Sequence, residues 1–138
     1  MNSYDRVPSS SRSQVGGRKK VLIVDDSFTA LMMMRMMLSQ IPCDVVTAAN
    51  GWDAVERALA ERPDLILMDI EMPRMNGIEA CRSMRQHDVT RAIPIILVTT
   101  RSDASHLRAG FDGGCTGYVT KPINAEELLM KVRNHLSR

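Results

Sequence analysis

The sequence predicts an α/β protein built on one doubly wound, five-stranded parallel sheet. Two observations lead to this prediction. From residue 20 to the C-terminus, short aliphatic runs alternate strictly with helical patterns, five of each. The aliphatic runs are apolar at nearly every position, which is typical of parallel strands covered by helices on both faces. Five strands are too few for a closed barrel of the eight-stranded kind.

The predicted strands are β-branched or aliphatic runs bounded by turn-forming residues. In chain order they are residues 21–25, 44–48, 64–69, 93–100 and 117–120. Apolar residues at helical spacing follow each strand. The predicted helices are residues 27–40, 51–61, 77–86, 103–111 and 124–136. Asp26 or Ser27 is suited to cap the first helix, because either side chain can accept a hydrogen bond from a free N–H group of the first turn.

The common solution for this alternation is a flavodoxin-like (βα)5 sheet of strand order 2-1-3-4-5. In such sheets, ligands bind beyond the carboxyl ends of the strands, at the switch point between strands 1 and 3. Residues 1–18 are rich in Ser, Gly and Arg and offset little of the entropy of ordering. We therefore expect a disordered leader over 1–18 and one domain over 19–138.

Composition and charge exclude several classes of function. The net charge is only +2, and the basic excess is concentrated in the first twenty residues, so no nucleic-acid binding is expected. Cys43, Cys81 and Cys115 are odd in number and lack metal-site spacing, which argues against disulfides and zinc. No apolar run is long enough to span a membrane and no signal sequence is present. We expect a cytoplasmic protein without membrane insertion.

Polar side chains stand where four of the predicted strands end. They are Asp25 and Asp26 after the first strand, Asp69 after the third, Thr99 and Thr100 after the fourth, and Lys121 after the fifth. Taken singly, most of them have a structural explanation as caps, β-formers or solvated charges. Asp69 is the exception, because a buried apolar strand rarely ends on an acid without a partner.

The proposed strand order brings the three carboxylates of Asp25, Asp26 and Asp69 into one cleft. Like charges this close raise one another's pKa unless a cation lies among them. Carboxylate oxygens are ligands for Mg²⁺, which readily completes its shell with phosphate oxygens. The hydroxyl of Thr99 and the ammonium of Lys121 would then complete a pocket for a phosphoryl group. Asp69 is therefore the predicted phosphate acceptor.

Four segments resemble the signature segments of response-regulator receiver domains, in particular of free-standing, CheY-like receivers. They are VLIVDDS (21–27), DLILMDIEMPRMNG (64–77), PIILVTT (94–100) and GYVTKP (117–122). The resemblance runs from about Lys20 to the end of the chain, and the combination is specific although each motif alone is weak. Cys115 departs from the family pattern, which usually has alanine at that place, and a buried thiol of similar size is tolerated there.

The resemblance implies a phospho-accepting response regulator of a two-component or phosphorelay system. Asp69 would be phosphorylated, with Mg²⁺ held by Asp26 and Asp69, by Asp25 through water, and by the main-chain carbonyl of Glu71. Lys121 would contact the phosphate. The cofactor implied is thus Mg²⁺, and the activity is phosphotransfer to its own Asp69 and self-dephosphorylation, not enzymatic turnover of another substrate.

The resemblance also implies a switch and two kinds of partner. Thr99 and Tyr118 would be the switch residues that change the surface of the fourth helix, fifth strand and fifth helix. The Lys121–Pro122 bond would be cis. A sensor histidine kinase or a histidine phosphotransfer protein would donate the phosphoryl group, and a downstream protein would bind the switched surface. We expect a monomer or weak dimer with no output domain in this chain. The resemblance does not select a pathway, because motility, development and relay shuttling all use such single domains.

Three alternative functions fit the sequence less well. A haloacid-dehalogenase-type phosphatase needs a second Asp two residues after the nucleophile, where this chain has Glu71. A nucleotide-binding module needs a glycine-rich phosphate loop after the first strand, and none is present. A static receiver-like module would not need the intact set of Asp69, Thr99 and Lys121.

The first helix, within SFTALMMMRMML, is too apolar to have a single buried face. Helical spacing predicts a buried stripe of Ala30, Met33, Met34, Met37 and Ile41. Phe28, Met32 and Met36 form a second stripe, which we expect to be the docking face for the phosphohistidine partner. Scattered exposed apolar residues are the alternative.

Glu71 and Arg101 carry opposite charges and each stands two residues beyond a pocket residue. They are predicted to pair over the pocket and slow attack of water on the phosphorylated Asp69. Two unrelated solvated side chains are the alternative, because exposed ion pairs contribute only ~0–1 kcal/mol.

Overall fold

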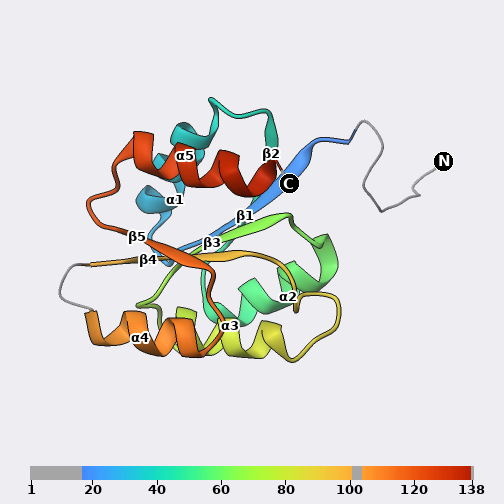
Figure 1. Ribbon diagram of the computed structural model, residues 1–138, viewed down its shortest axis with the longest axis vertical. Helices are drawn as coiled ribbons and strands as arrows, with labels where there is room; N and C mark the ends of the chain where they lie inside the picture. The colour runs from blue at the N-terminus through green and yellow to red at the C-terminus, as the bar shows by residue number, and fades with distance from the viewer. Residues whose placement is uncertain (1–16, 101–103, 138) are drawn as a thin grey trace.

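The computed structural model describes residues 17–100 and 104–137 (Figure 1), with side chains described for 17–100 and 107–137. Five parallel strands form one sheet in the order β2-β1-β3-β4-β5, which confirms the predicted topology. The strands are β1 (Lys19–Val24), β2 (Cys43–Ala48), β3 (Leu65–Asp69), β4 (Ile95–Thr99) and β5 (Gly117–Thr120). The helices are α1 (Phe28–Leu38), α2 (Gly51–Glu61), α3 (Gly77–Arg85), α4 (Ala104–Asp112) and α5 (Ala125–Leu136). Nearly all of the predicted leader, 1–18, lies outside the described residues.

Helices cover both faces of the sheet, with α1 and α5 on one side and α2, α3 and α4 on the other (Figure 1). Successive side chains of a strand point to opposite faces, so each central strand must be apolar throughout. On β1, Val21 and Ile23 pack with α1 and α5, whereas Leu22 and Val24 pack with α2 and α3. This two-sided burial explains why the strands read as continuous aliphatic runs.

Helix α1 is rotated relative to the predicted stripe. Met34 and Ile41 are buried as expected, but Met33 is 54% exposed, so its predicted burial is wrong. Leu38, which was not predicted, is buried instead, and Leu31 packs against the same core. A helix with seven methionines or leucines among the eight residues 31–38 offers several apolar stripes of nearly equal strength. The sheet selects the one that contains both leucines.

Asparagine and serine side chains begin four of the helices. Ser27 accepts from the N–H of Ala30 at the start of α1, so Ser27 provides the cap that the sequence left open between two residues. Asn76 and Glu79 form a reciprocal capping box at α3. The Asn-Gly pair at 76–77 thus forms the cap and first residue of a helix.

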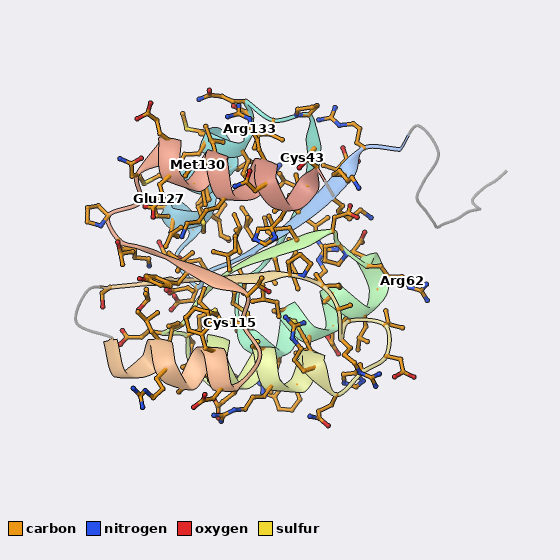
Figure 2. The ribbon with its side chains drawn as sticks, viewed as in Figure 1. Cys43, Arg62, Cys115, Glu127, Met130 and Arg133 are labelled. Carbon is orange, nitrogen blue, oxygen red and sulfur yellow. The ribbon has the colours of Figure 1, made fainter. Side chains whose placement is uncertain are left out.

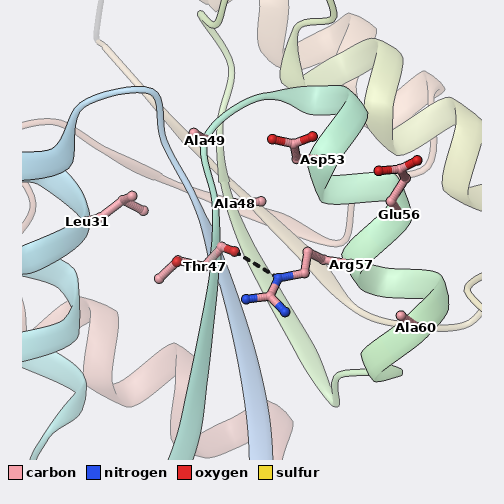
Figure 3. Close-up of a pocket in the computed structure, with 8 residues that line it drawn as sticks. All are labelled: Leu31, Thr47, Ala48, Ala49, Asp53, Glu56, Arg57 and Ala60. Atoms are coloured by element: carbon pink, nitrogen blue, oxygen red, sulfur yellow. Dashed lines mark hydrogen bonds between the residues drawn. The ribbon is translucent and has the colours of Figure 1, made fainter.

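A groove of about 500 Å³ runs along the open edge of β2, between Leu31 of α1 and the charged face of α2 (Figure 3). The carbonyl of Ala48 accepts from the N–H of Asp25 in the neighbouring chain segment. Because successive carbonyls alternate sides, the carbonyl of Thr47 faces the open edge. The Nε of Arg57 donates to it at 3.2 Å, which closes that position of the edge.

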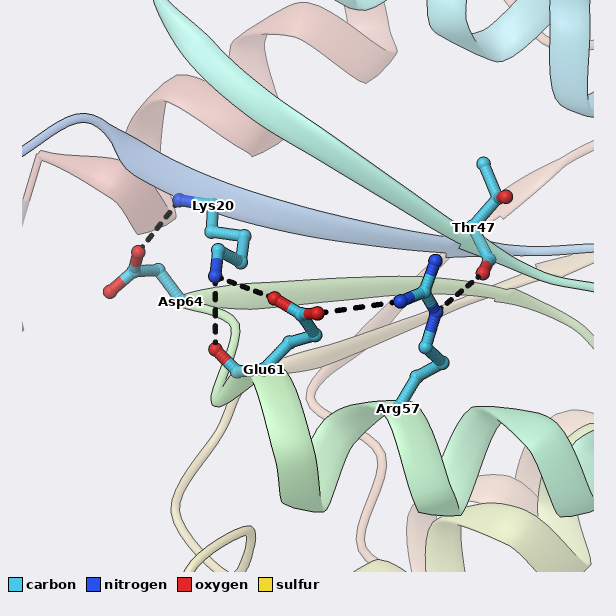
Figure 4. A network of polar contacts seen from close by, with 5 residues as sticks. All are labelled: Lys20, Thr47, Arg57, Glu61 and Asp64. Carbon is cyan, nitrogen blue, oxygen red and sulfur yellow. Dashed lines mark hydrogen bonds and ion pairs between the residues drawn. The ribbon is translucent and has the colours of Figure 1, made fainter. Parts of the chain in front are cut away.

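Arg57 belongs to a chain of polar contacts that ties α2 to the sheet (Figure 4). Its Nη1 lies 3.3 Å from Glu61 Oε2, and Glu61 Oε1 in turn lies 2.8 Å from Lys20 Nζ on β1. The hydrogen bond from Lys20, with its charge, lowers the pKa of Glu61 against the opposing effect of burial. The backbone N–H of Lys20 donates to Asp64 just before β3. This network extends from Lys20 near the amino end of β1 to Thr47 near the carboxyl end of β2.

All three cysteines are free and buried (Figure 2 labels Cys43 and Cys115). Burial raises the pKa of each thiol, that of Cys115 to about 11, so all three stay protonated at neutral pH and act as small core residues. None of the helices within 17–100 and 104–137 is both long enough and apolar enough to cross a bilayer.

The orientation of α1 gives a direct test. Leu38→Ala removes a fully packed side chain and is expected to lower the free energy of unfolding by ~2–5 kcal/mol. Met33→Ala, on the exposed side, is expected to change it by less than ~0.5 kcal/mol. Urea unfolding followed by circular dichroism measures both. A larger effect at Met33 than at Leu38 would show that α1 packs in the originally predicted phase.

Candidate functional site

The candidate site lies at the carboxyl edge of the sheet, where four strands end side by side (toward the left in Figure 1). Asp25 follows β1 directly, and Asp69 is the last residue of β3. Thr99 ends β4, and Lys121 follows β5. Because β1 pairs with β3, β3 with β4 and β4 with β5, all four side chains reach the same end of the sheet.

The three predicted acids form one cluster. Each of Asp25, Asp26 and Asp69 has a carboxylate oxygen within 4.8 Å of an oxygen of both others. Asp25 and Asp69 are buried, whereas Asp26 lies at the solvent side. Lys121 Nζ is 3.3 Å from Asp69 Oδ1 and 3.6 Å from Asp25 Oδ2. One ammonium group thus faces three carboxylates, which leaves an excess of negative charge.

The cluster satisfies the conditions for a divalent cation. Asp25 Oδ1 accepts from the N–H of Ser27 at 2.9 Å, which fixes the carboxylate. Within the described residues, the buried Oδ2 of Asp25 has no hydrogen-bond partner. A buried carboxylate oxygen with unused acceptor capacity, beside two further carboxylates, is a donor set suited to Mg²⁺. The residues present therefore fit the predicted metal.

The titration of the site reflects the same excess of charge. Burial is the largest cause that raises the pKa of Asp69, and the neighbouring Asp25 adds to it, giving a value of about 6. Burial alone would lower the pKa of Lys121, but its attraction to Asp69 and Asp25 outweighs burial and raises it. Lys121 therefore stays charged at neutral pH.

The predicted switch residues lie on the neighbouring strands. Thr99 is buried, and its hydroxyl donates to the carbonyl of Thr100 at 3.2 Å. Tyr118, on β5, is 36% exposed and packs edge-to-face against Phe111 of α4, with ring centroids 6.2 Å apart. Lys131 of α5 lies 5.3 Å from the centre of the Tyr118 ring and donates to its carbonyl. Tyr118 therefore points to the outer surface, between α4 and α5.

The end of β5 is held beside β4. The N–H of Lys121 donates to the carbonyl of Thr99 at 2.7 Å, so the backbones of two predicted site residues are joined directly. The Lys121–Pro122 peptide bond is cis, as predicted. The ammonium of Lys121 reaches the acids from this position.

Two glycines near the site were not singled out by the sequence. A Cβ at Gly77 would lie 2.3 Å from the carbonyl oxygen of Asp69, and one at Gly51 would lie 2.3 Å from that of Met75. Only glycine allows α3 and α2 to begin this close to the loop that follows β3. Each glycine follows an Asn that caps a helix, and this repeated Asn-Gly-x-acid pattern was the signal that could have identified them.

The predicted ion pair over the pocket and the predicted docking stripe involve residues outside the acid cluster. Glu71 is exposed on the loop after β3, whereas Arg101 lies outside the described residues, so their pairing stays a prediction. Phe28 and Met36, at the two ends of the second stripe on α1, are 76% and 71% exposed, and Met32 between them is also exposed. The stripe begins one residue after Ser27, beside the acids.

Comparisons with known proteins agree with the resemblance to receiver domains. Residues 21–133 match the family model of the response regulator receiver domain. The chain is 41% identical to PilH of Pseudomonas aeruginosa over 113 residues, which are 82% of this chain and 93% of PilH. It is 39% identical to the response regulator ArlR of Staphylococcus saprophyticus over 119 residues, 86% of this chain but only 53% of ArlR. The chain thus spans about half the length of ArlR.

Solved structures show the same fold. A putative response regulator of Chloroflexus aurantiacus superposes with a TM-score of 0.83 at 34% identity, covering 88% of this chain and all of that one. The chemotaxis protein CheY4 of Vibrio cholerae gives 0.81 at 34%, covering 87% and 100%. The receiver domain of the sensor histidine kinase PA1611 of Pseudomonas aeruginosa, described with a magnesium ion in its active-site cleft, gives 0.81 at 27%, covering 88% and 100%.

The raised pKa of Asp69 makes a prediction about stability. Asp69 binds its proton more tightly in the folded state than in the unfolded state. Its contribution to the free energy of unfolding therefore falls as pH rises from about 3.8 to about 6, and the fall is complete above that range. In EDTA, Asp69→Asn, which keeps an acceptor for Lys121, should raise the free energy of unfolding by ~3 kcal/mol near pH 7.5 and by only ~1 kcal/mol near pH 4.5. Urea titrations at the two pH values measure the difference. A gain that does not depend on pH would contradict the assignment.

Proposed function

This chain belongs to the receiver-domain family of two-component response regulators, and from this premise we propose that its own signalling chemistry is phosphorylation of Asp69. Domains of this family act in signalling with histidine kinases or phosphotransfer proteins. The observation that carries the proposal is a buried carboxylate at the end of an apolar strand, 3.3 Å from a lysine and clustered with two further acids.

Asp25, Asp26, Asp69 and the main-chain carbonyl of Glu71 are the groups that would hold Mg²⁺. The ion, when bound, supplies positive charge to the oxygens of the transferred phosphoryl group. Its affinity depends on ionised carboxylates, and burial together with the neighbouring charge of Asp25 raises the pKa of Asp69 to about 6.

In the proposed transfer, an ionised oxygen of Asp69 attacks the phosphorus of a phosphohistidine on the donor protein. The new bond is the acyl phosphate O–P bond, and the P–N bond to the imidazole breaks, with its electron pair returning to the nitrogen. Lys121 is positioned to neutralise charge on the phosphoryl oxygens, because its ammonium already lies within 3.3 Å of Asp69. Attack of water on the same phosphorus later releases inorganic phosphate and restores Asp69.

The proposed switch uses Thr99 and Tyr118. A phosphoryl oxygen on Asp69 offers the Thr99 hydroxyl a charged acceptor in place of the neutral Thr100 carbonyl. Movement of Thr99 toward the phosphate makes room for Tyr118 to turn inward from its contacts with Phe111 and Lys131. The surface of α4, β5 and α5 then differs between the two states, and a downstream protein that prefers one state shifts the population toward it.

The donor is proposed to dock on the α1 stripe of Phe28, Met32 and Met36. This stripe is exposed, apolar and next to the acids, so a helical phosphohistidine domain seated on it would bring its imidazole to Asp69. Flexible methionine side chains adapt to a partner's contours. A cytoplasmic location follows from the reaction, because histidine kinases present their phosphohistidine to soluble partners.

Small-molecule phosphorylation tests the acceptor. Acetyl phosphate with Mg²⁺ is expected to add one phosphoryl group to the wild-type chain and none to Asp69→Asn, as measured by intact mass. Asp26→Asn should still accept the group, but only at higher Mg²⁺, because it loses one charged ligand while keeping the nucleophile. A mass increase in Asp69→Asn equal to that of the wild type would reject the acceptor assignment.

Comparison of two donors tests the docking stripe. Met32→Glu and Met36→Glu are expected to lower the rate of transfer from a phosphohistidine protein at least ~tenfold, because a charge enters an apolar contact. Labelling by acetyl phosphate should not change, since a small donor needs only the pocket.

The matched control is Val89→Glu. Val89 and Met32 are both 42% exposed, but Val89 lies before β4, at the opposite end of the sheet. This variant should react with both donors as the wild type does. If the stripe variants also behave as the wild type with the protein donor, the stripe is not the docking surface.

A further inference from the structure

A second candidate contact surface lies where the end of α1 meets α5, and it includes neither the acids nor Tyr118. Glu126, Met130 and Arg133 follow one another at four- and three-residue steps and share one outward side of α5. Met130 is 57% exposed, and Figure 2 shows Met130 and Arg133 on α5, across the sheet from α4. An acid, an apolar side chain and a base thus form one line along the helix, which we call the α5 line.

A groove of about 470 Å³ adjoins the α5 line. It is lined by Leu129, Met130 and the two charged ends of the line, and by Gln40 from the end of α1. Gln40 lies two residues after the end of α1, so the groove spans the end of α1 and the outer side of α5. Leu129 and Met130 give the groove an apolar centre, Gln40 and Asn134 add uncharged polar groups, and Glu126 and Arg133 place one charge at each end.

Glu126 and Arg133, the charged ends of the α5 line, form no ion pair within the described part of the chain. The ion pairs of α5 in that part involve Lys131 and Glu127, 3.7 Å apart, on the side that faces β5 and Tyr118. Neither Glu126 nor Arg133 takes part in an ion pair there. Two opposite charges, one turn on either side of an exposed methionine, are therefore available to a partner.

We propose that this surface binds a second copy of the chain across a two-fold axis. A two-fold interface brings the same patch of both copies together, so residue i contacts residue j and residue j contacts residue i. With the two α5 helices antiparallel and the axis passing between Leu129 and Met130, Glu126 of each copy meets Arg133 of the other. Both ion pairs form at once, and each Met130 enters the groove of the opposite copy.

The opposite charges of Glu126 and Arg133 favour a second copy of the chain over other partners. A partner of uniform negative charge would gain at Arg133 and lose at Glu126, and a basic partner the reverse. A patch with one charge of each sign on either side of an apolar centre is complementary to its own rotated copy. The proposal does not rest on phosphorylation of Asp69, because the α5 line includes none of the clustered acids, nor Thr99, Tyr118 or Lys121.

Charge reversal in the full-length chain tests the pairing. Sedimentation equilibrium from ~10 µM to ~1 mM covers the range of weak association. The wild type is expected to move from monomer toward dimer over this range. Glu126→Arg alone and Arg133→Glu alone should each raise the dissociation constant at least ~tenfold, because each places two like-charged pairs across the axis.

Mixing the two single variants provides the decisive measurement. In an equal mixture, both charges of one variant meet their opposites on the other. A heterodimer should therefore form over the same concentration range as the wild-type dimer, although each variant alone associates at least ~tenfold more weakly. The double variant Glu126→Arg with Arg133→Glu should likewise self-associate within about threefold of the wild type. A variant that merely weakens α5 could not be rescued in this way.

Two further variants complete the test. Met130→Gln removes the apolar centre without adding charge and should weaken association, whereas Glu56→Arg, an exposed reversal on α2 across the sheet, should not. Thermal unfolding shows that each variant is folded. A wild type that stays monomeric up to ~1 mM would overturn the proposal. So would single variants that dimerise normally, or a mixture that stays monomeric.

Discussion

The structure depends on holding two buried carboxylates next to each other at the end of an apolar sheet. Pairing of β1 with β3 sets the spacing of Asp25 and Asp69, and neither acid can move away without breaking strand hydrogen bonds. Charges placed like this are costly unless they are compensated. The rest of the site follows from that cost. Lys121 is brought in from β5, the N–H of Ser27 binds Asp25, and a further cation is favoured.

The sequence was sufficient for the parts of the fold that depend on local patterns. Continuous aliphatic runs identified the parallel strands because both faces of the sheet are covered, and the single acid at the end of β3 identified the site because nothing in a strand of Leu65–Met68 explains it. Strand order then followed from a small number of allowed topologies, and it brought residues 25, 26, 69, 99 and 121 to one edge. These predictions needed only periodicity and the rules of sheet connection.

The remaining features needed three-dimensional contacts. Met33 and Leu38 exchange their expected places because α1 is apolar on almost every side, so that spacing alone cannot select the face that packs on the sheet. Gly77 and Gly51 matter through atoms of other segments, which no local pattern contains. The groove beside the α5 line could not be predicted from the sequence, because Gln40 and Met130 lie about ninety residues apart in the chain yet line the same groove.

The edge of the sheet at β2 shows how a surface ion pair can serve more than local stability. Arg57 occupies the outward carbonyl of Thr47, and it is held there by Glu61, which in turn is anchored by Lys20 on β1. An open strand edge is a template for pairing with another chain. Since the guanidinium that covers this edge is carried by α2, any fluctuation that lifts α2 also uncovers a carbonyl able to accept a foreign strand. The resistance of this strand edge to aggregation therefore depends on how stably α2 packs against the sheet.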